Sequence, residues 1–171
     1  MVRNDSMSSM ATPSWLLLHR TVRFGDTDAA GVMHFHQLLR WCHEAYEQSL
    51  EAFGVPPACV FPMAAADRPA GLEAPAVALP IVHCSADFRR PLVCGDPLLI
   101  QLEPVRLDPG SFEVRYRFQR VRTGEPPQDA ALGLTRHLAI KAASRQRCPL
   151  PAPIGRWLEA AAVASGGIHP V

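Results

Sequence analysis

The sequence predicts an α+β fold in which an antiparallel sheet of about five strands wraps around one long helix. Two observations support this prediction. Between His36 and Phe53, apolar residues recur at intervals of three and four, as on one face of a helix. From Ile81 onward, apolar and polar residues alternate in segment after segment, as in strands with one buried face. The 171 residues suffice for one domain with a core of its own.

The first half of the chain predicts a tail, a strand, a turn and the helix, in that order. Residues 1–14 are polar and are expected to form a flexible tail. Residues 16–24 alternate as a strand, and residues 25–31 contain the glycines and aspartates that are typical of a turn. The helix follows, and Gly54 with the prolines just after it ends the helix.

The second half predicts a long loop and then four strands. Six prolines between residues 55 and 80 exclude a long helix there. The alternating segments that follow are joined by short turns and cover residues 81–89, 98–103, 112–119 and 132–140. We therefore divide the chain into a flexible N-terminal tail (1–14), one domain (15–145) and a C-terminal extension (146–171). Within the extension, a short helix can form near Ile154 to Ala164.

Composition and charge narrow the class of protein. Hydrophobic residues make up 48% of the chain and charged residues 19%, which excludes wholesale disorder. The 17 basic and 16 acidic residues leave a net charge of +1, too balanced for binding nucleic acid mainly through phosphates. No apolar run approaches the roughly 18 residues of a membrane helix, and none suits a signal peptide. We therefore expect a cytoplasmic protein with no membrane span and no nucleic-acid partner.

The cysteines and histidines give no reason to expect a metal or an organic cofactor. The five cysteines include no CxxC pair, so we expect them to be buried, unreactive thiols. His34, His36 and His43 lie close together in the sequence, but no carboxylate completes a recognisable set of metal ligands.

The stretch from Phe24 to Phe35 carries the most chemical information. It places two carboxylates, Asp26 and Asp28, and two glycines directly before the predicted helix. A helix begins with unpaired backbone amides and a partial positive charge, which stabilise a carboxylate or a carbonyl oxygen that becomes an oxyanion. A nucleophile or base beside such an anion site suits acyl transfer. A simpler interpretation is that one aspartate only caps the helix or the turn, and the residues alone leave both open.

This stretch resembles the signature of the 4-hydroxybenzoyl-CoA thioesterase family, a Gly-Asp-x-Asp-x-x-Gly turn that leads into the central helix of a hotdog fold. The resemblance covers about residues 16–142. Residues 42–47, 78–88 and 94–96 are most similar to the branch of the family that hydrolyses 1,4-dihydroxy-2-naphthoyl-CoA in phylloquinone biosynthesis. The resemblance therefore implies a hotdog fold and an acyl-CoA thioesterase that acts on an aromatic acyl group.

The resemblance also assigns site residues by their position in the motif. It implies that Asp28 is the catalytic carboxylate, which either attacks the thioester carbonyl or activates a water. The backbone amide of Phe35, in the first turn of the helix, is then the oxyanion donor, and Asp26 shapes the turn. His83 is a candidate for a hydrogen bond to a substrate hydroxyl, with a purely structural role equally open.

Two further features bear on substrate binding. Glu44 shares a helix face with Arg40 and Gln48, so we expect it to be solvated or at an interface rather than catalytic. Related thioesterases use a basic cluster to hold the phosphates of CoA, but the corresponding turn here, residues 108–110, is not basic. The residues that bind CoA therefore stay unassigned.

The resemblance implies self-association as a homodimer or homotetramer, with the active site between protomers. The sequence alone shows only that a sheet edge and part of the helix need cover. Two other functions stay open, a hotdog hydratase or dehydratase and a non-catalytic acyl-binding module. The spacing from Asp28 to His34 is six residues, whereas the dehydratases require five, which counts against the first.

Overall fold

The long helix α1 spans Phe35–Phe53, within one residue of the predicted start and at the predicted end. The computed structural model describes residues 11–63, 65–67, 69–71 and 73–166. His34 is the N-cap of α1, and its side chain accepts from the amide of His36. Gly54 ends the helix with a φ of 100°, a left-handed conformation that glycine adopts without strain.

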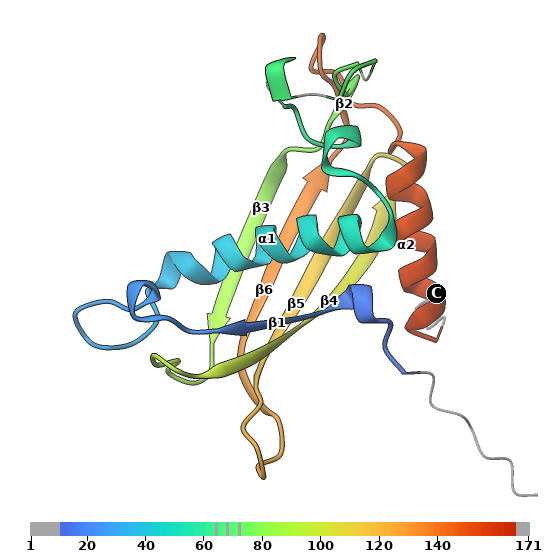
Figure 1. The fold of residues 1–171 in the computed structure, drawn as a ribbon. Helices are drawn as coiled ribbons and strands as arrows, with labels where there is room; N and C mark the ends of the chain where they lie inside the picture. The colour runs from blue at the N-terminus through green and yellow to red at the C-terminus, as the bar shows by residue number, and fades with distance from the viewer. Residues whose placement is uncertain (1–10, 64, 68, 72, 167–171) are drawn as a thin grey trace, which may run out of the picture.

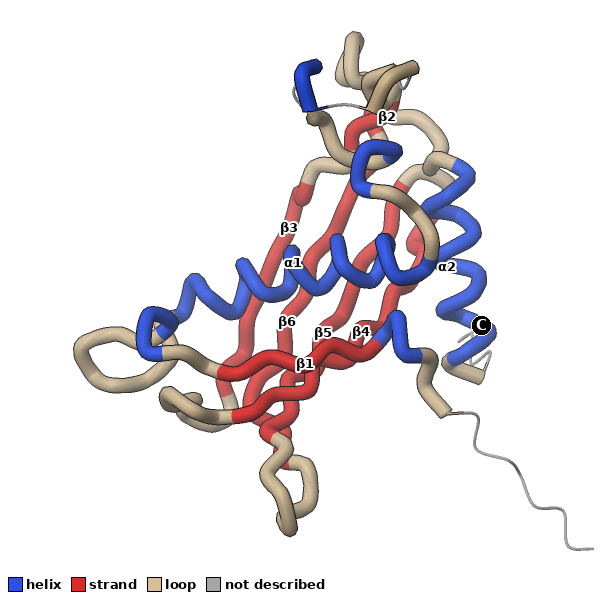
Figure 2. The backbone as a smooth tube through the Cα atoms, in the orientation of Figure 1, coloured by secondary structure: helices blue, strands red, loops and turns tan. Residues whose placement is uncertain are grey.

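One antiparallel sheet of five strands lies on one side of α1, in the order β1-β4-β5-β6-β3 (Figures 1 and 2). Its strands are β1 (Leu17–Thr21), β3 (Ile81–Phe88), β4 (Pro97–Asp108), β5 (Ser111–Arg120) and β6 (Gln128–Leu138). Two short strands, β2 (Val77–Ala78) and β7 (Ile140–Lys141), pair with each other outside this sheet. The predicted α+β hotdog arrangement is therefore confirmed.

Strand β1 is shorter than the predicted strand because the chain turns at its end. Residues Phe24–Asp26 form a 3-10 turn, η2, in which the Asp26 carboxylate accepts from the amide of Arg23 at 2.7 Å. Three other 3-10 turns are η1 (Ser14–Leu16), η3 (Pro57–Cys59) and η4 (Ala65–Asp67). The proline-rich segment between α1 and β3 thus contains only short elements in its described part, as predicted from its prolines.

The helix packs very closely on the sheet. A Cβ atom added at Gly133 on β6 would collide with Sγ of Cys42 on α1. Any larger residue at this point of contact would have to displace the Cys42 side chain. The core on this face is formed by large side chains that are almost completely inaccessible, including Leu38, Tyr46, Phe112, Tyr116 and Phe118.

A second helix, α2 (Ala152–Ala164), belongs to the same core. Its Ile154, Trp157, Leu158 and Ala161 are buried. The indole N–H of Trp157 donates to Oγ of Ser49 on α1 at 3.1 Å, and the ring lies 5.7 Å from that of Tyr46. Helix α2 thus covers the end of the layer between α1 and the sheet. Residues 1–10 of the predicted N-terminal tail lie outside the described residues, and the division of the chain at residues 14 and 145 stays a prediction. Among the described helices, none is long and apolar enough to cross a membrane.

Strand β3 lies at the edge of the sheet and is poorly covered on both faces. Its apolar residues Ile81, Val82 and Phe88 are 40%, 51% and 47% exposed. The alternating pattern predicted the strand correctly but did not indicate its position at the edge. A long edge with exposed apolar side chains is a surface that proteins normally cover.

Candidate active site

The loop between β1 and α1 is closed by hydrogen bonds of Asp26. Besides its side-chain bond to Arg23, the backbone carbonyl of Asp26 accepts from the amide of His34 at 2.8 Å. This bond ties the start of the loop to the residue that caps α1. Asp26 therefore shapes the turn, as expected.

Asp28 lies in the next turn of the same loop, with an exposed side chain. Its carbonyl accepts from the amide of Gly31 at 3.0 Å, and its Oδ1 accepts from the amide of Ala30 at 2.8 Å. Gly31 has a φ of 77°, which this turn requires and glycine tolerates. Oδ2 of Asp28 has no hydrogen-bond partner among the described residues, so one carboxylate oxygen is oriented and the other is available.

The amide of Phe35 is available as well. As the first residue of α1, it has no acceptor inside the helix. Within the described ranges the structure gives it no other acceptor, whereas the amides of His36 and Gln37 are both bonded to His34. The Phe35 N–H is therefore free to stabilise an oxyanion at the positive end of the helix.

The entrance of α1 is rich in exposed rings. The side chain of Phe35 is 69% exposed, and its ring lies 4.6 Å from that of His34. The Nδ1 atoms of His34 and His36 are in direct contact. Because Nδ1 of His34 also accepts from the amide of His36, the ring N–H of His36 is the donor of this hydrogen bond. An aromatic acyl group held near the Phe35 amide would find apolar and polar ring surfaces beside it.

A single copy of the described chain leaves Asp28 in an open position. A cavity of about 590 Å³ on the outer face of the sheet is lined by Ser85, Arg115 and Leu134 among others, but not by Asp28. A second hollow of about 600 Å³ reaches the loop through Asp26 and not through Asp28. Neither of these two hollows includes Asp28.

His83 is not brought to this loop by the chain itself. It is exposed on β3 and lies opposite Arg136 of β6 in the strand register. Because Thr135 and His137 on either side of Arg136 face α1, alternation places Arg136 and His83 on the outer face of the sheet. No hydrogen bond or ion pair between His83 and Asp28 exists within the described residues. Its contact with substrate stays a prediction.

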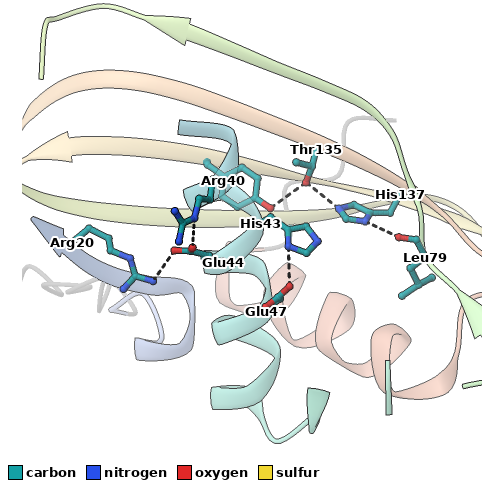
Figure 3. Close-up of polar contacts among 9 residues, drawn as sticks. Arg20, Arg40, His43, Glu44, Glu47, Leu79, Thr135 and His137 are labelled. Carbon is teal, nitrogen blue, oxygen red and sulfur yellow. Dashed lines mark hydrogen bonds and ion pairs between the residues drawn. The ribbon is translucent and has the colours of Figure 1, made fainter. Parts of the chain in front are cut away.

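Glu44 is engaged in ion pairs on the surface of α1. Its Oε1 lies 2.8 Å from Nε of Arg40, and its Oε2 lies 3.8 Å from Arg20 on β1 (Figure 3). These contacts agree with the solvated role expected for this side chain.

A chain of buried hydrogen bonds was not anticipated from the sequence. The hydroxyl of Tyr116 lies 3.1 Å from Oγ1 of Thr135, which lies 3.0 Å from Nε2 of His137. Nδ1 of His137 lies 3.3 Å from the carbonyl oxygen of Leu79 (Figure 3). Because a carbonyl only accepts, His137 donates through Nδ1, and the protons of the whole chain point from Tyr116 toward Leu79. Burial lowers the pKa of His137 to about 4, so the ring is neutral at pH 7.

Asp96 is a second buried polar residue, inside one of the segments that carried the resemblance. Burial alone raises the pKa of its carboxyl group. The amide of Val93 and the guanidinium groups of Arg122 and Arg120 outweigh burial and lower the pKa below its ordinary value. Arg122 contacts Asp96 at 2.6 Å, which links the turn before β4 to the loop after β5. The role of Asp96 is structural.

The prediction that the cysteines are buried holds only for Cys42. Cys59, Cys84 and Cys94 are exposed, because Cys84 lies on the uncovered edge strand and the other two lie outside the regular elements of the sheet and helices α1 and α2. Burial raises the pKa of the Cys42 thiol well above its usual range, which keeps it unreactive. Among the residues that the structure describes, no group of three or more His, Cys, Asp or Glu could hold a metal ion.

Comparison with known proteins gives the same family as the resemblance of the loop before α1. Residues 22–158 match the family model of the thioesterase-like superfamily. A 1,4-dihydroxy-2-naphthoyl-CoA hydrolase of Prochlorococcus marinus (strain MIT 9303) is 56% identical over 92% of this chain and 99% of its own. An enzyme of the same name from Synechococcus sp. (strain CC9311) is 55% identical over 92% of this chain and 96% of its own.

Solved structures agree. A chain from Prochlorococcus marinus MIT 9313 superposes with a TM-score of 0.80 at 55% identity, covering 89% of this chain and 99% of that one. A 1,4-dihydroxy-2-naphthoyl-CoA thioesterase from Synechocystis superposes with a TM-score of 0.63 at 29% identity, covering 91% and 98%. The chain therefore belongs to the thioesterase-like superfamily, in the group whose members are named 1,4-dihydroxy-2-naphthoyl-CoA hydrolase.

Proposed function

We propose that this chain is an acyl-CoA thioesterase that hydrolyses 1,4-dihydroxy-2-naphthoyl-CoA to 1,4-dihydroxy-2-naphthoate and CoA, a step of phylloquinone biosynthesis. Relatives that are 52% to 56% identical to it are named for this activity. The structural observation that carries the proposal is the unpaired amide of Phe35 at the start of α1, joined to Asp28 by one short, hydrogen-bonded loop.

The chemistry needs an attacking oxygen and a group that stabilises the negative charge of the tetrahedral intermediate. In one route, Asp28 attacks the thioester carbonyl and expels the CoA thiolate, and water then hydrolyses the mixed anhydride. In the other route, Asp28 takes a proton from a water molecule that attacks the same carbon. Both routes place negative charge on the carbonyl oxygen, where the N–H of Phe35 and the helix dipole stabilise it.

A second copy of the chain would complete the site. The edge of β3 is long, unpaired among the described strands and lined with exposed apolar side chains. Antiparallel pairing of two such edges would satisfy their backbone groups and cover Ile81, Val82 and Phe88. We therefore include a homodimer, or a homotetramer built from it, in the proposal, with the acyl-CoA bound between protomers in the cytoplasm and no resident cofactor.

The release of free thiol from a panel of acyl-CoA thioesters tests the function. We expect stoichiometric CoA from 1,4-dihydroxy-2-naphthoyl-CoA and much slower release from aliphatic acyl-CoA of similar size. A hydratase would consume an enoyl-CoA without releasing thiol, and a binding module would bind the thioesters without turnover. Absence of thiol release from the naphthoyl thioester would overturn the proposal.

A further inference from the structure

His43 on α1 lies outside the loop and amide described above, yet it has a carboxylate partner of its own. Its Nδ1 lies 2.8 Å from Oε1 of Glu47, one helical turn further on (Figure 3). The two side chains are 41% and 43% exposed, so neither is committed to the core. Within the part of the chain that the structure describes, Nε2 of His43 has no hydrogen-bond partner. The imidazole is thus held on one side and available on the other.

The surroundings of His43 are aromatic. Its ring centroid lies 6.0 Å from that of Tyr46 and 6.2 Å from that of Phe61, and these two rings lie 5.9 Å apart, edge to face. The hydroxyl of Tyr46 is buried and has no hydrogen-bond partner among the described residues. Aromatic side chains with a few unpaired polar groups are typical of sites that bind a hydroxylated aromatic ring.

The position of His43 along the helix suits the far end of an acyl group. Leu39 and His43 follow Phe35 at intervals of four residues, so the three side chains lie toward one side of α1. His43 stands eight positions after Phe35, which is about 12 Å along the axis. The His43 side chain leans back toward the N-terminus and shortens this distance. An aromatic acyl group whose carbonyl oxygen is held by the Phe35 amide would extend along this side of the helix.

We propose that His43, held by Glu47, determines specificity by forming a hydrogen bond with the ring hydroxyl most remote from the thioester. With Nδ1–H directed toward Glu47, Nε2 is an acceptor for a phenolic O–H. This inference rests on the proposed function, because it names the part of the same substrate that the site distinguishes. His43 is a binding residue in this account and takes no part in proton transfer to the thioester.

The test compares two substrates that differ in that hydroxyl alone. The values of kcat/KM are measured for 1,4-dihydroxy-2-naphthoyl-CoA and for 1-hydroxy-2-naphthoyl-CoA. One hydrogen bond predicts a preference of about 10-fold for the dihydroxy substrate in the unmodified protein. In His43→Leu the ratio of the two kcat/KM values falls to about 1. His43→Gln, which keeps an acceptor, retains part of the preference and covers the case in which His43→Leu does not fold.

Glu51→Gln is the matched control for Glu47→Gln. Glu51 lies one turn beyond Glu47 on α1, is exposed and has no side-chain partner among the described residues. We expect Glu47→Gln to reduce the preference and Glu51→Gln to leave it unchanged. A preference that persists in a folded His43→Leu or His43→Gln protein at the unmodified value overturns the inference, and so does equal hydrolysis of both substrates by the unmodified protein. Both results leave the thioesterase function intact, whereas no thiol release from either substrate overturns that function itself.

Discussion

At the scale of single residues, the two aspartates of the loop before α1 differ in their hydrogen bonds. Asp26 makes its bonds within the loop, to Arg23 through its side chain and to His34 through its backbone. One carboxylate oxygen of Asp28 accepts from the amide of Ala30, and the other has no hydrogen-bond partner among the described residues. The same side-chain type in one loop thus supports structure at one position and is available for chemistry at the other.

This difference predicts opposite outcomes for the same substitution. Asp28→Asn removes the nucleophile or base, so we expect kcat to fall about 10³-fold while the free energy of unfolding changes little. Asp26→Asn weakens the turn and is expected to cost about 1 kcal/mol of stability with a smaller effect on kcat. Thiol-release kinetics and urea unfolding of both variants check the pair. Near-normal turnover in a folded Asp28→Asn protein would remove this residue from the mechanism.

His137 predicts a loss of stability in mild acid. Its pKa is about 4 in the folded protein, chiefly because of burial, whereas an unfolded histidine titrates at about 6.5. As the pH falls from about 6.5 to about 4, the unfolded state binds a proton that the folded state does not. The free energy of unfolding should therefore decrease over this window, by about 3 kcal/mol from this residue.

Urea unfolding at pH 7 and pH 4.5 measures this decrease. In His137→Gln, we expect the free energy of unfolding at pH 7 to be lower and its decrease toward pH 4.5 to be smaller. His19→Gln, the same change at an exposed histidine on β1, should keep the full decrease. Equal pH dependence in His137→Gln and the unmodified protein would show that His137 titrates normally.

At the scale of elements, helix α2 closes the end of the core through one large side chain. Trp157 is completely buried between Tyr46 and Phe112 and donates to Ser49. We expect Trp157→Ala to cost about 4 kcal/mol, because it leaves a cavity as well as an unpaired hydroxyl. Trp157→Phe keeps most of the packing and should cost about 1 kcal/mol for the lost hydrogen bond. Urea unfolding distinguishes the two, and a cost below about 1 kcal/mol for Trp157→Ala would mean that α2 is not part of the cooperative core.

A helix or strand could be predicted where the pattern that indicates it lies within its own residues. The spacing of apolar residues in α1 and Gly54 at its end predicted that helix closely, since both signals lie in the helix itself. The burial of α2 was not predictable, because it depends on a space left open by α1 and β5. Apolar and polar residues alternate around Val82, and this pattern is the same for an edge strand as for a central strand. The exposure of β3 could therefore not be predicted either.

The candidate site was predictable to a similar extent. Asp28 and Phe35 are candidates because the motif before the helix resembles that of the family, and their roles stay a prediction. The chain from Tyr116 to Leu79 joins β5, β6 and the segment before β3, so it depends on strand register. Thr135 and His137 stand two residues apart on β6 and so share its inner face. Two polar residues on a buried face were the one sign in the sequence of this chain of hydrogen bonds.

At the scale of the whole molecule, the uncovered edge of β3 predicts that assembly and activity are coupled. Val82→Glu places a charge on that edge, so we expect a shift toward monomer and a fall in kcat/KM of about 10-fold or more, with the monomer still folded. Val163→Glu, on the exposed side of α2, is the matched control and should change neither property. Light scattering after size-exclusion chromatography and thiol-release assays measure both. A monomeric Val82→Glu protein with full activity would contradict a shared active site.

The hydrogen bond from His137 to Leu79 has a consequence for that edge. Leu79 stands two residues before β3, so the buried chain of hydrogen bonds fixes the point at which the strand leaves the interior. We therefore expect a change in the length of the proline-rich segment upstream to leave this point in place. Two molecules that paired along their β3 strands would therefore present the same residues to each other. The register of that pairing would be set by the buried hydrogen bonds inside each molecule.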